Sequence, residues 1–308
     1  PLPLPSPDIT RIPAALEAAG KSDAVILVLG DMVGLFQNGT VGEGSDVSTL
    51  RLPGVQQQLL DALIETGKPV ALVLVSGRPY DIGNAAEKLS AFTAAWLPGE
   101  GGGEAVSRML FGIDQPGGKT PISFPISAGA MPYAYNHTPK AGGMPRQREF
   151  GARYPFGFGL SYTSFSCSDA AVSAEEVSAD GKVQISCTVK NTGDRPGDEV
   201  LQIYVRDICS SVVRPVQELK GYARVSLNPG KQSRVTFTLP VDMLSFYSEG
   251  RRIVEPGRFK LMLGTSSEDI FWNTTITVTG EQRILPSDWR LKSIVHVEPL
   301  KDTVSGTL

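Results

Sequence analysis

The feature that most constrains the fold is a pair of unbroken apolar runs, AVILVLG (24–30) and PVALVLVSG (69–77). Both have the length of a single strand and consist mainly of valine, leucine, isoleucine and alanine. Strands that are apolar on both faces are typical of a parallel sheet covered by helices on each side. A third apolar segment, AFTAAWLP (91–98), extends the expected sheet.

Segments with helical periodicity separate these runs. They cover residues 9–23, 55–68 and 102–112. The alternation of strands and helices predicts an α/β sandwich domain over residues 1–138, with a mostly parallel sheet flanked by helices. Ligands of such sheets bind at the carboxyl ends of the strands, so the long loop after the first strand and Arg78 after the second are the first places to look for a site.

The second half of the chain has a different pattern. Short alternating segments are separated by turn signals such as NTGDRPGD, NPGK and EPG; they cover residues 182–191, 199–207, 233–240 and 257–265. Regularly spaced strands and turns predict an antiparallel β-sandwich over residues 165–280. A connector rich in Gly and Pro, residues 139–164, precedes it, and residues 281–308 are expected to form a polar tail without clear periodicity.

The loop TVGEGSDVSTLRLPG (40–54) contains the strongest candidate for a catalytic residue. Glu43 lies between glycines after a buried strand, where a carboxyl group could reach into a cleft. A general acid/base needs such reach and an environment that raises its pKa. Loop carboxylates are mostly solvated, so the residues alone leave both roles open. Asp46 is expected to cap or bond the loop backbone.

Two other motifs look similar to known functional motifs, but neither is assigned a function. In GGKT (117–120) the spacing from the preceding Gly112 does not fit a phosphate-binding loop, and Pro121 stands where the helix should begin. PSDWRL (286–291) contains an acid beside a tryptophan, a pair often used by enzymes that cleave sugars. No strand-like run precedes it, so a surface turn is the better interpretation.

Composition excludes several classes of protein. The formal net charge is −3 and there is no basic run, so no nucleic-acid partner is expected. No apolar stretch reaches the roughly 18–20 residues of a membrane span, and no secretion signal is visible. His137 and His296 are the only histidines, and Cys167, Cys187 and Cys209 lack metal-ligand spacing. No metal or cofactor is expected. The cysteines are buried free thiols or include one disulfide.

Several segments, in this order, resemble the C-terminal portion of glycoside hydrolase family 3, the β-glucosidase and β-xylosidase family. They include SDAVILVLGD (22–31), GEGSDVSTLRLPGVQQQLL (42–60), TGKPVALVLVSGRP (66–79), RYPFGFGLSYTSF (153–165) and EPGRFKLMLGTSS (255–267). Bacterial periplasmic β-glucosidases look most similar. The resemblance implies an N-terminally incomplete α/β sandwich domain followed by a fibronectin type III-like domain. It also implies retaining hydrolysis of terminal β-linked glucose or xylose without a metal, and a periplasmic or secreted setting.

The resemblance also implies roles for individual residues. Glu43 matches the acid/base Glu of the family's E-G-x-D-R stretch, although Val47 stands where an Arg is typical. The Asp nucleophile normally comes from a preceding barrel, to which nothing here corresponds. The expected partners are therefore a β-linked oligosaccharide or β-glucoside and a nucleophile-bearing barrel, on a missing N-terminal region or a separate chain. No substrate-binding residue is assigned, and the isolated chain is expected to be inactive. The alternative is a non-catalytic carbohydrate-binding or protein-interaction module derived from such an enzyme.

Overall fold

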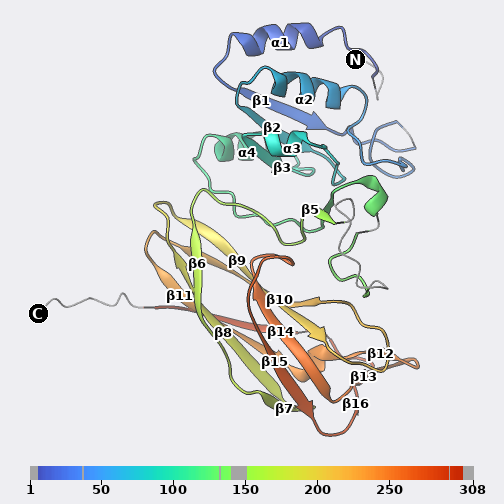
Figure 1. The fold of residues 1–308 in the computed structure, drawn as a ribbon, viewed down its shortest axis with the longest axis vertical. Coiled ribbons are helices and arrows are strands. Elements are labelled where there is room, and N and C mark those ends of the chain that lie inside the picture. The colour runs from blue at the N-terminus through green and yellow to red at the C-terminus, as the bar shows by residue number, and fades with distance from the viewer. Residues whose placement is uncertain (1–5, 37, 132, 140–150, 291, 301–308) are drawn as a thin grey trace, which may run out of the picture. The chain divides into compact units, whose positions relative to one another are not determined.

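A computed structural model describes residues 6–36, 38–131, 133–139, 151–290 and 292–300. The chain divides into two compact units (Figure 1). Of the described residues, the first unit contains 6–113, 124–133 and 151–153, and the second contains 114–123, 134–139 and 154–300. The two units thus take short segments from both sides of the expected boundary at residue 138.

The first unit is built on a parallel three-stranded sheet in the order β1-β2-β3. Its strands are β1 (Val25–Gly30), β2 (Val70–Val75) and β3 (Ala91–Ala94). Both pairings are parallel, with Val25 opposite Val70 and Ala71 opposite Ala91. The parallel sheet predicted from the apolar runs is confirmed.

Within the described residues, the α-helices of this unit are α1 (Ile12–Gly20), α2 (Gln56–Glu65), α3 (Ala85–Lys88) and α4 (Gly102–Leu110). α1 lies alongside α2, and α2 contacts β1 (Figure 1). The side-chain amide of Gln56 joins α2 to the end of β1, because it accepts from the Gly30 amide at 2.7 Å and donates to the Gly30 carbonyl at 2.8 Å. The unit also contains the short helix η1 (Ala128–Ala130) and β4 (Phe124–Pro125), which pairs with β5 (Ala152–Tyr154). None of the described helices combines the length and apolar character needed to cross a bilayer.

The two faces of the sheet are covered unequally. On the central strand β2, the consecutive residues Leu72, Val73 and Leu74 are all buried, as expected for a strand covered on both sides. On β1, Leu27 is buried, but Ile26 and Val28 are 52% and 60% exposed. Among the described residues, therefore, the outer face of β1 lacks the cover that its apolar sequence predicts.

The second unit is an antiparallel β-sandwich. Its larger sheets have the strand orders β10-β9-β14-β15-β7 and β17-β11-β8-β6, and a smaller sheet has the order β12-β13-β16. The first five strands are β6 (Phe165–Val172), β7 (Glu176–Ser178), β8 (Lys182–Asn191), β9 (Gly197–Asp207) and β10 (Glu218–Leu227). Next come β11 (Gln232–Pro240), the short helix η2 (Val241–Leu244), β12 (Phe246–Ser248) and β13 (Arg251–Val254). The last strands are β14 (Gly257–Gly264), β15 (Ile270–Thr279), β16 (Arg283–Ile284) and β17 (Ile294–Pro299). Apolar residues form the core of the sandwich, with Ile185, Leu201, Val235 and Leu261 completely buried.

The C-terminal segment differs from the expected tail over 281–308. β16 joins the small sheet, and β17 pairs with β11 so that Val295 lies opposite Phe237. The physical reason is that β17 is an edge strand whose side chains are mostly exposed. Such a strand contributes backbone hydrogen bonds without needing a strong apolar pattern, so periodicity alone does not detect it.

All three cysteines are free thiols. Cys187 is buried, Cys167 is partly buried and Cys209 is exposed. A hydrogen bond between the Cys167 and Cys187 thiols, together with burial, raises the pKa of Cys167. Cys167 and Cys187 therefore act as small apolar groups of the sandwich core. For these two residues, the expectation of buried free thiols holds rather than that of a disulfide.

Candidate functional site

The loop that carries Glu43 leaves the carboxyl end of β1 and folds back on itself. The Gly34 amide donates to the Val41 carbonyl at 2.9 Å, and the Phe36 amide donates to the Glu43 carbonyl at 2.8 Å. The backbone of Glu43 is thus fixed. Its side chain is exposed, and among the described residues it has no hydrogen-bond or ion-pair partner.

Arg78, which follows β2, clamps this loop on both sides of Glu43. Its guanidinium donates through Nη1 to the Thr40 carbonyl and through Nη2 to the Ser45 carbonyl. These acceptors lie three residues before and two residues after Glu43 in the chain. The planar fork of an arginine has several donors at fixed angles, so a single side chain can hold two separate backbone segments.

Asp31 connects the same loop to the ends of β1 and β2. Its carboxylate accepts from the Thr40 hydroxyl at 2.7 Å, from the Gly77 amide at 3.0 Å and from the Tyr80 hydroxyl. Tyr80 is buried. Burial, and secondarily the hydrogen bond to Asp31, raise the pKa of Tyr80 to about 12. Its hydroxyl therefore stays protonated and continues to donate at ordinary pH.

The expected role of Asp46 is not what the structure shows. Asp46 is exposed, and its carboxylate bonds to no backbone group among the described residues. Asp31 and Arg78 hold the loop instead. A sequence signal for this pair exists, since both residues follow neighbouring parallel strands, and the carboxyl ends of such strands lie at one edge of the sheet.

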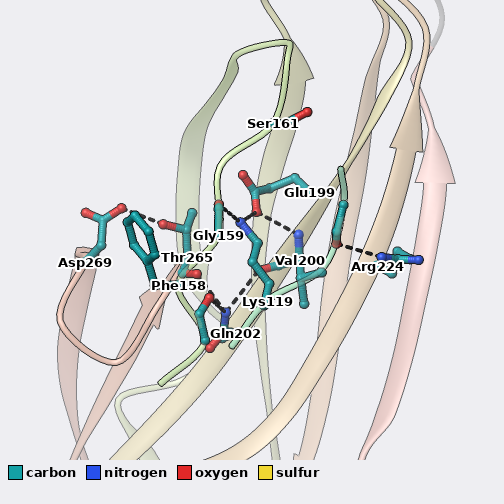
Figure 2. A network of polar contacts seen from close by, with 12 residues as sticks. Lys119, Phe158, Gly159, Ser161, Glu199, Val200, Gln202, Arg224, Thr265 and Asp269 are labelled. Atoms are coloured by element: carbon teal, nitrogen blue, oxygen red, sulfur yellow. Dashed lines mark hydrogen bonds and ion pairs between the residues drawn. The ribbon is translucent and has the colours of Figure 1, made fainter. Parts of the chain in front are cut away.

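A second polar cluster lies in the second unit and contains the lysine of GGKT (Figure 2). Lys119 Nζ forms an ion pair with Glu199 Oε1 at 2.8 Å and donates to the Gly159 carbonyl at 2.8 Å. The same Glu199 oxygen accepts from the Val200 amide at 2.7 Å. Both side chains are largely buried. This lysine is occupied by protein partners, in keeping with the rejection of a phosphate-binding loop.

Two further expectations from the sequence concern the PSDWRL motif and metal binding. Pro286–Trp289 forms the expected surface turn, closed by the Trp289 amide donating to the Pro286 carbonyl at 3.1 Å, with Asp288 exposed. The part of the chain that the structure describes contains no group of three His, Cys, Asp or Glu side chains that could hold a metal ion.

The described residues thus combine an α/β unit, built on a parallel sheet, with an antiparallel β-sandwich. Residues 9–162 match the glycosyl hydrolase family 3 C-terminal domain, and residues 199–267 match the fibronectin type III-like domain. The chain belongs to glycosyl hydrolase family 3. The family resemblance and the fold class predicted from the sequence are confirmed.

Individual relatives match the chain over most of its length. A beta-xylosidase of Formosa agariphila is 41% identical over 261 residues, which cover 83% of this chain and 35% of that protein. A periplasmic beta-glucosidase of Salmonella typhimurium is 37% identical over 268 residues, which cover 83% of this chain and 34% of that protein. The crystal structure of beta-glucosidase from Listeria innocua in complex with glucose has a TM-score of 0.81 and 32% identity, and the match covers 89% of this chain and 39% of that one. The chain thus spans between a third and two fifths of the length of these relatives.

Proposed function

We propose that this chain is the acid/base-bearing part of a retaining β-glycosidase that releases terminal β-linked glucose or xylose. The observation that carries the proposal is the exposed Glu43 carboxylate on a loop that Arg78 and Asp31 hold at the carboxyl edge of a parallel sheet. The names of the relatives, beta-xylosidase and beta-glucosidase, support the substrate class. The name of the Salmonella relative supports a periplasmic or secreted location.

In this proposal Glu43 acts twice. It first gives its proton to the glycosidic oxygen as the bond to the anomeric carbon breaks, and it then takes a proton from the water that attacks the glycosyl intermediate. The nucleophile is a second carboxylate about 5 Å away in retaining enzymes. We assign it to a barrel domain outside this chain, which docks so that the Glu43 loop faces its sugar site.

The test uses this chain together with a nucleophile-bearing barrel. Glu43→Ala is expected to lower turnover of β-glucosides with poor leaving groups by about 10²–10⁴-fold, because these need protonation to depart. Activated aryl glucosides should lose much less in the first step, and azide should restore turnover with formation of β-glucosyl azide. The control Asp46→Ala, an exposed carboxylate in the same loop, should change turnover by less than about twofold. Unchanged turnover of Glu43→Ala without any azide effect would show that Glu43 is the wrong carboxylate.

A second experiment tests the missing nucleophile. The chain alone is expected to release no sugar from an aryl β-glucoside, and enzyme-like release would contradict the proposal. The alternative, a non-catalytic binding or interaction module, is favoured by the exposed apolar face of β1. Calorimetry with glucose and cellobiose, and capture of a barrel-containing protein, discriminate between the two functions: a module that binds sugar but never supports hydrolysis with a barrel is not part of an enzyme.

A further inference from the structure

A hollow of about 490 Å³ lies in the second unit and is lined by residues of β12, β13 and β16. Figure 1 labels these three strands, which form the small sheet. The β12–β13 hairpin forms one wall. Its two central residues, Glu249 and Gly250, both have positive φ angles of 48° and 75°, as in a type I′ turn, which keeps the hairpin tight. The pairing places Tyr247 directly opposite Arg252.

The other wall is the turn Pro286–Trp289. The Leu285 amide donates to the Arg252 carbonyl at 2.9 Å, and the following turn brings Trp289 back over Arg252. The guanidinium carbon of Arg252 lies 4.4 Å from the centre of the Tyr247 ring and 4.8 Å from that of the Trp289 ring. An arginine held by two aromatic rings is ordered before any ligand arrives.

The donors of this arginine are mostly free for a ligand. Among the described residues the Arg252 guanidinium makes one hydrogen bond, from Nη1 to the Ser245 hydroxyl at 3.2 Å. Its remaining N–H groups lie along the edge of the planar guanidinium, where they can donate to acceptors in that plane. A carboxylate fits this edge because its two oxygens match the fork of two N–H groups.

The lining of the hollow is positive. Arg251 and Arg290 line it together with Arg252, and none of the described residues that line it is acidic. Arg251 pairs with Glu249 only at 3.8 Å and with both side chains exposed, so solvent screens that attraction. Arg290 donates to two backbone carbonyls of its own turn at 3.1 Å each. The local field therefore favours an anion.

We propose that this hollow binds an acidic sugar residue, a uronic acid, through an Arg252–carboxylate pair with the pyranose ring against the aromatic side chains. Tyr247 is 66% exposed and offers ring surface to the C–H groups of a sugar. The volume falls within the usual range of small-ligand sites. None of these residues belongs to the Glu43 loop, so the binding proposed here does not depend on the proposed hydrolysis.

The test is a titration of the 308-residue chain with glucuronic acid, followed by tryptophan fluorescence and calorimetry. Glucose is the matched neutral ligand, because it has the same ring without the carboxylate. Saturable binding of glucuronate is expected, at least about tenfold tighter than that of glucose, and it should weaken with added salt. Arg252→Met and Trp289→Ala should abolish it. Arg258→Ala, which removes an exposed arginine of β14, should leave it unchanged.

Three results would overturn the proposal: equal affinity for glucose and glucuronate, full affinity in Arg252→Met, or acetate competing as well as glucuronate. The last result would show a simple anion site without sugar recognition. Because Trp289 also packs against the sandwich core, thermal unfolding of each variant is measured first. Trp289→Phe, which keeps an aromatic ring, replaces Trp289→Ala if that variant does not fold, and it should retain part of the affinity.

Discussion

At the scale of single residues, Arg78 controls the Glu43 loop through backbone acceptors alone. It donates to the Thr40 and Ser45 carbonyls and to no side chain of the segment between them. A clamp of this kind does not depend on the identity of the residues that it encloses. The segment between Thr40 and Ser45 can therefore vary in sequence and still be held in the same way.

Removing the clamp should open the loop. Arg78→Ala is expected to accelerate cleavage after Glu43 by a glutamate-specific protease about tenfold or more, because two charge-assisted hydrogen bonds to the loop are lost. Arg51→Ala is the matched control, since Arg51 is an exposed arginine of the same loop whose side chain has no hydrogen-bond partner among the described residues. Equal cleavage of both variants would mean that Arg78 does not order the Glu43 backbone. Arg78→Lys should restore only part of the protection, because an ammonium cannot reproduce the fork.

Tyr80 makes the stability of the folded chain depend on pH. Its pKa in the folded chain is about 12 against an ordinary value of 10.0, so the unfolded chain loses this proton at lower pH than the folded chain does. The stabilisation that Tyr80 contributes through its raised pKa is complete below pH 10 and is lost as the pH rises towards 12.

The variant Tyr80→Phe tests whether the stability that Tyr80 contributes decreases as the pH rises. The variant should be less stable than the original chain by about 1–2 kcal/mol near neutral pH, because it lacks the hydrogen bond to Asp31. Between about pH 9 and about pH 11 the difference should shrink by about 1 kcal/mol. Urea unfolding of both chains across this range measures the difference. A difference that stays constant or grows with pH would exclude Tyr80 as a proton-linked contributor.

At the scale of elements, much of the architecture could be predicted from local patterns. The apolar runs 24–30 and 69–77 became β1 and β2, and the strand segments predicted between turn signals in the second half became β8, β9, β11 and β14. The edge strand β17 was not predicted, because an exposed strand needs no apolar alternation. The contact between Asp31 and Tyr80 beside the Glu43 loop was missed for another reason. Asp31 and Tyr80 are 49 positions apart, and only the parallel pairing of β1 with β2 brings them together.

The two faces of β1 give an element-scale prediction. Leu27→Ala should cost about 2–5 kcal/mol of unfolding free energy, because it empties part of the core. Val28→Ala, at the neighbouring position on the exposed face, should cost less than about 1 kcal/mol in the isolated chain. Urea unfolding of the two variants makes the comparison. Comparable losses would show that the outer face of β1 is covered in solution.

At the scale of the whole molecule, each of the two units carries a different proposed site. The first unit carries the acid/base candidate Glu43 on a braced loop, and the second carries the positively lined hollow around Arg252. The chain corresponds to roughly a third of the relatives that it matches, and their names describe complete glycosidases. Hydrolysis is thus a property that we propose for a larger assembly, whereas recognition of an acidic sugar is proposed for this chain by itself.

The outer strand of the α/β unit has a practical consequence. Among the described residues β1 pairs on one side only, so its other side still presents peptide N–H and C=O groups, beside the uncovered Ile26 and Val28. Open peptide groups next to apolar side chains form a ready template for another strand. Concentrated solutions of the chain should therefore tend to self-associate, and a natural neighbour that shields this strand would suppress that tendency while completing the sheet.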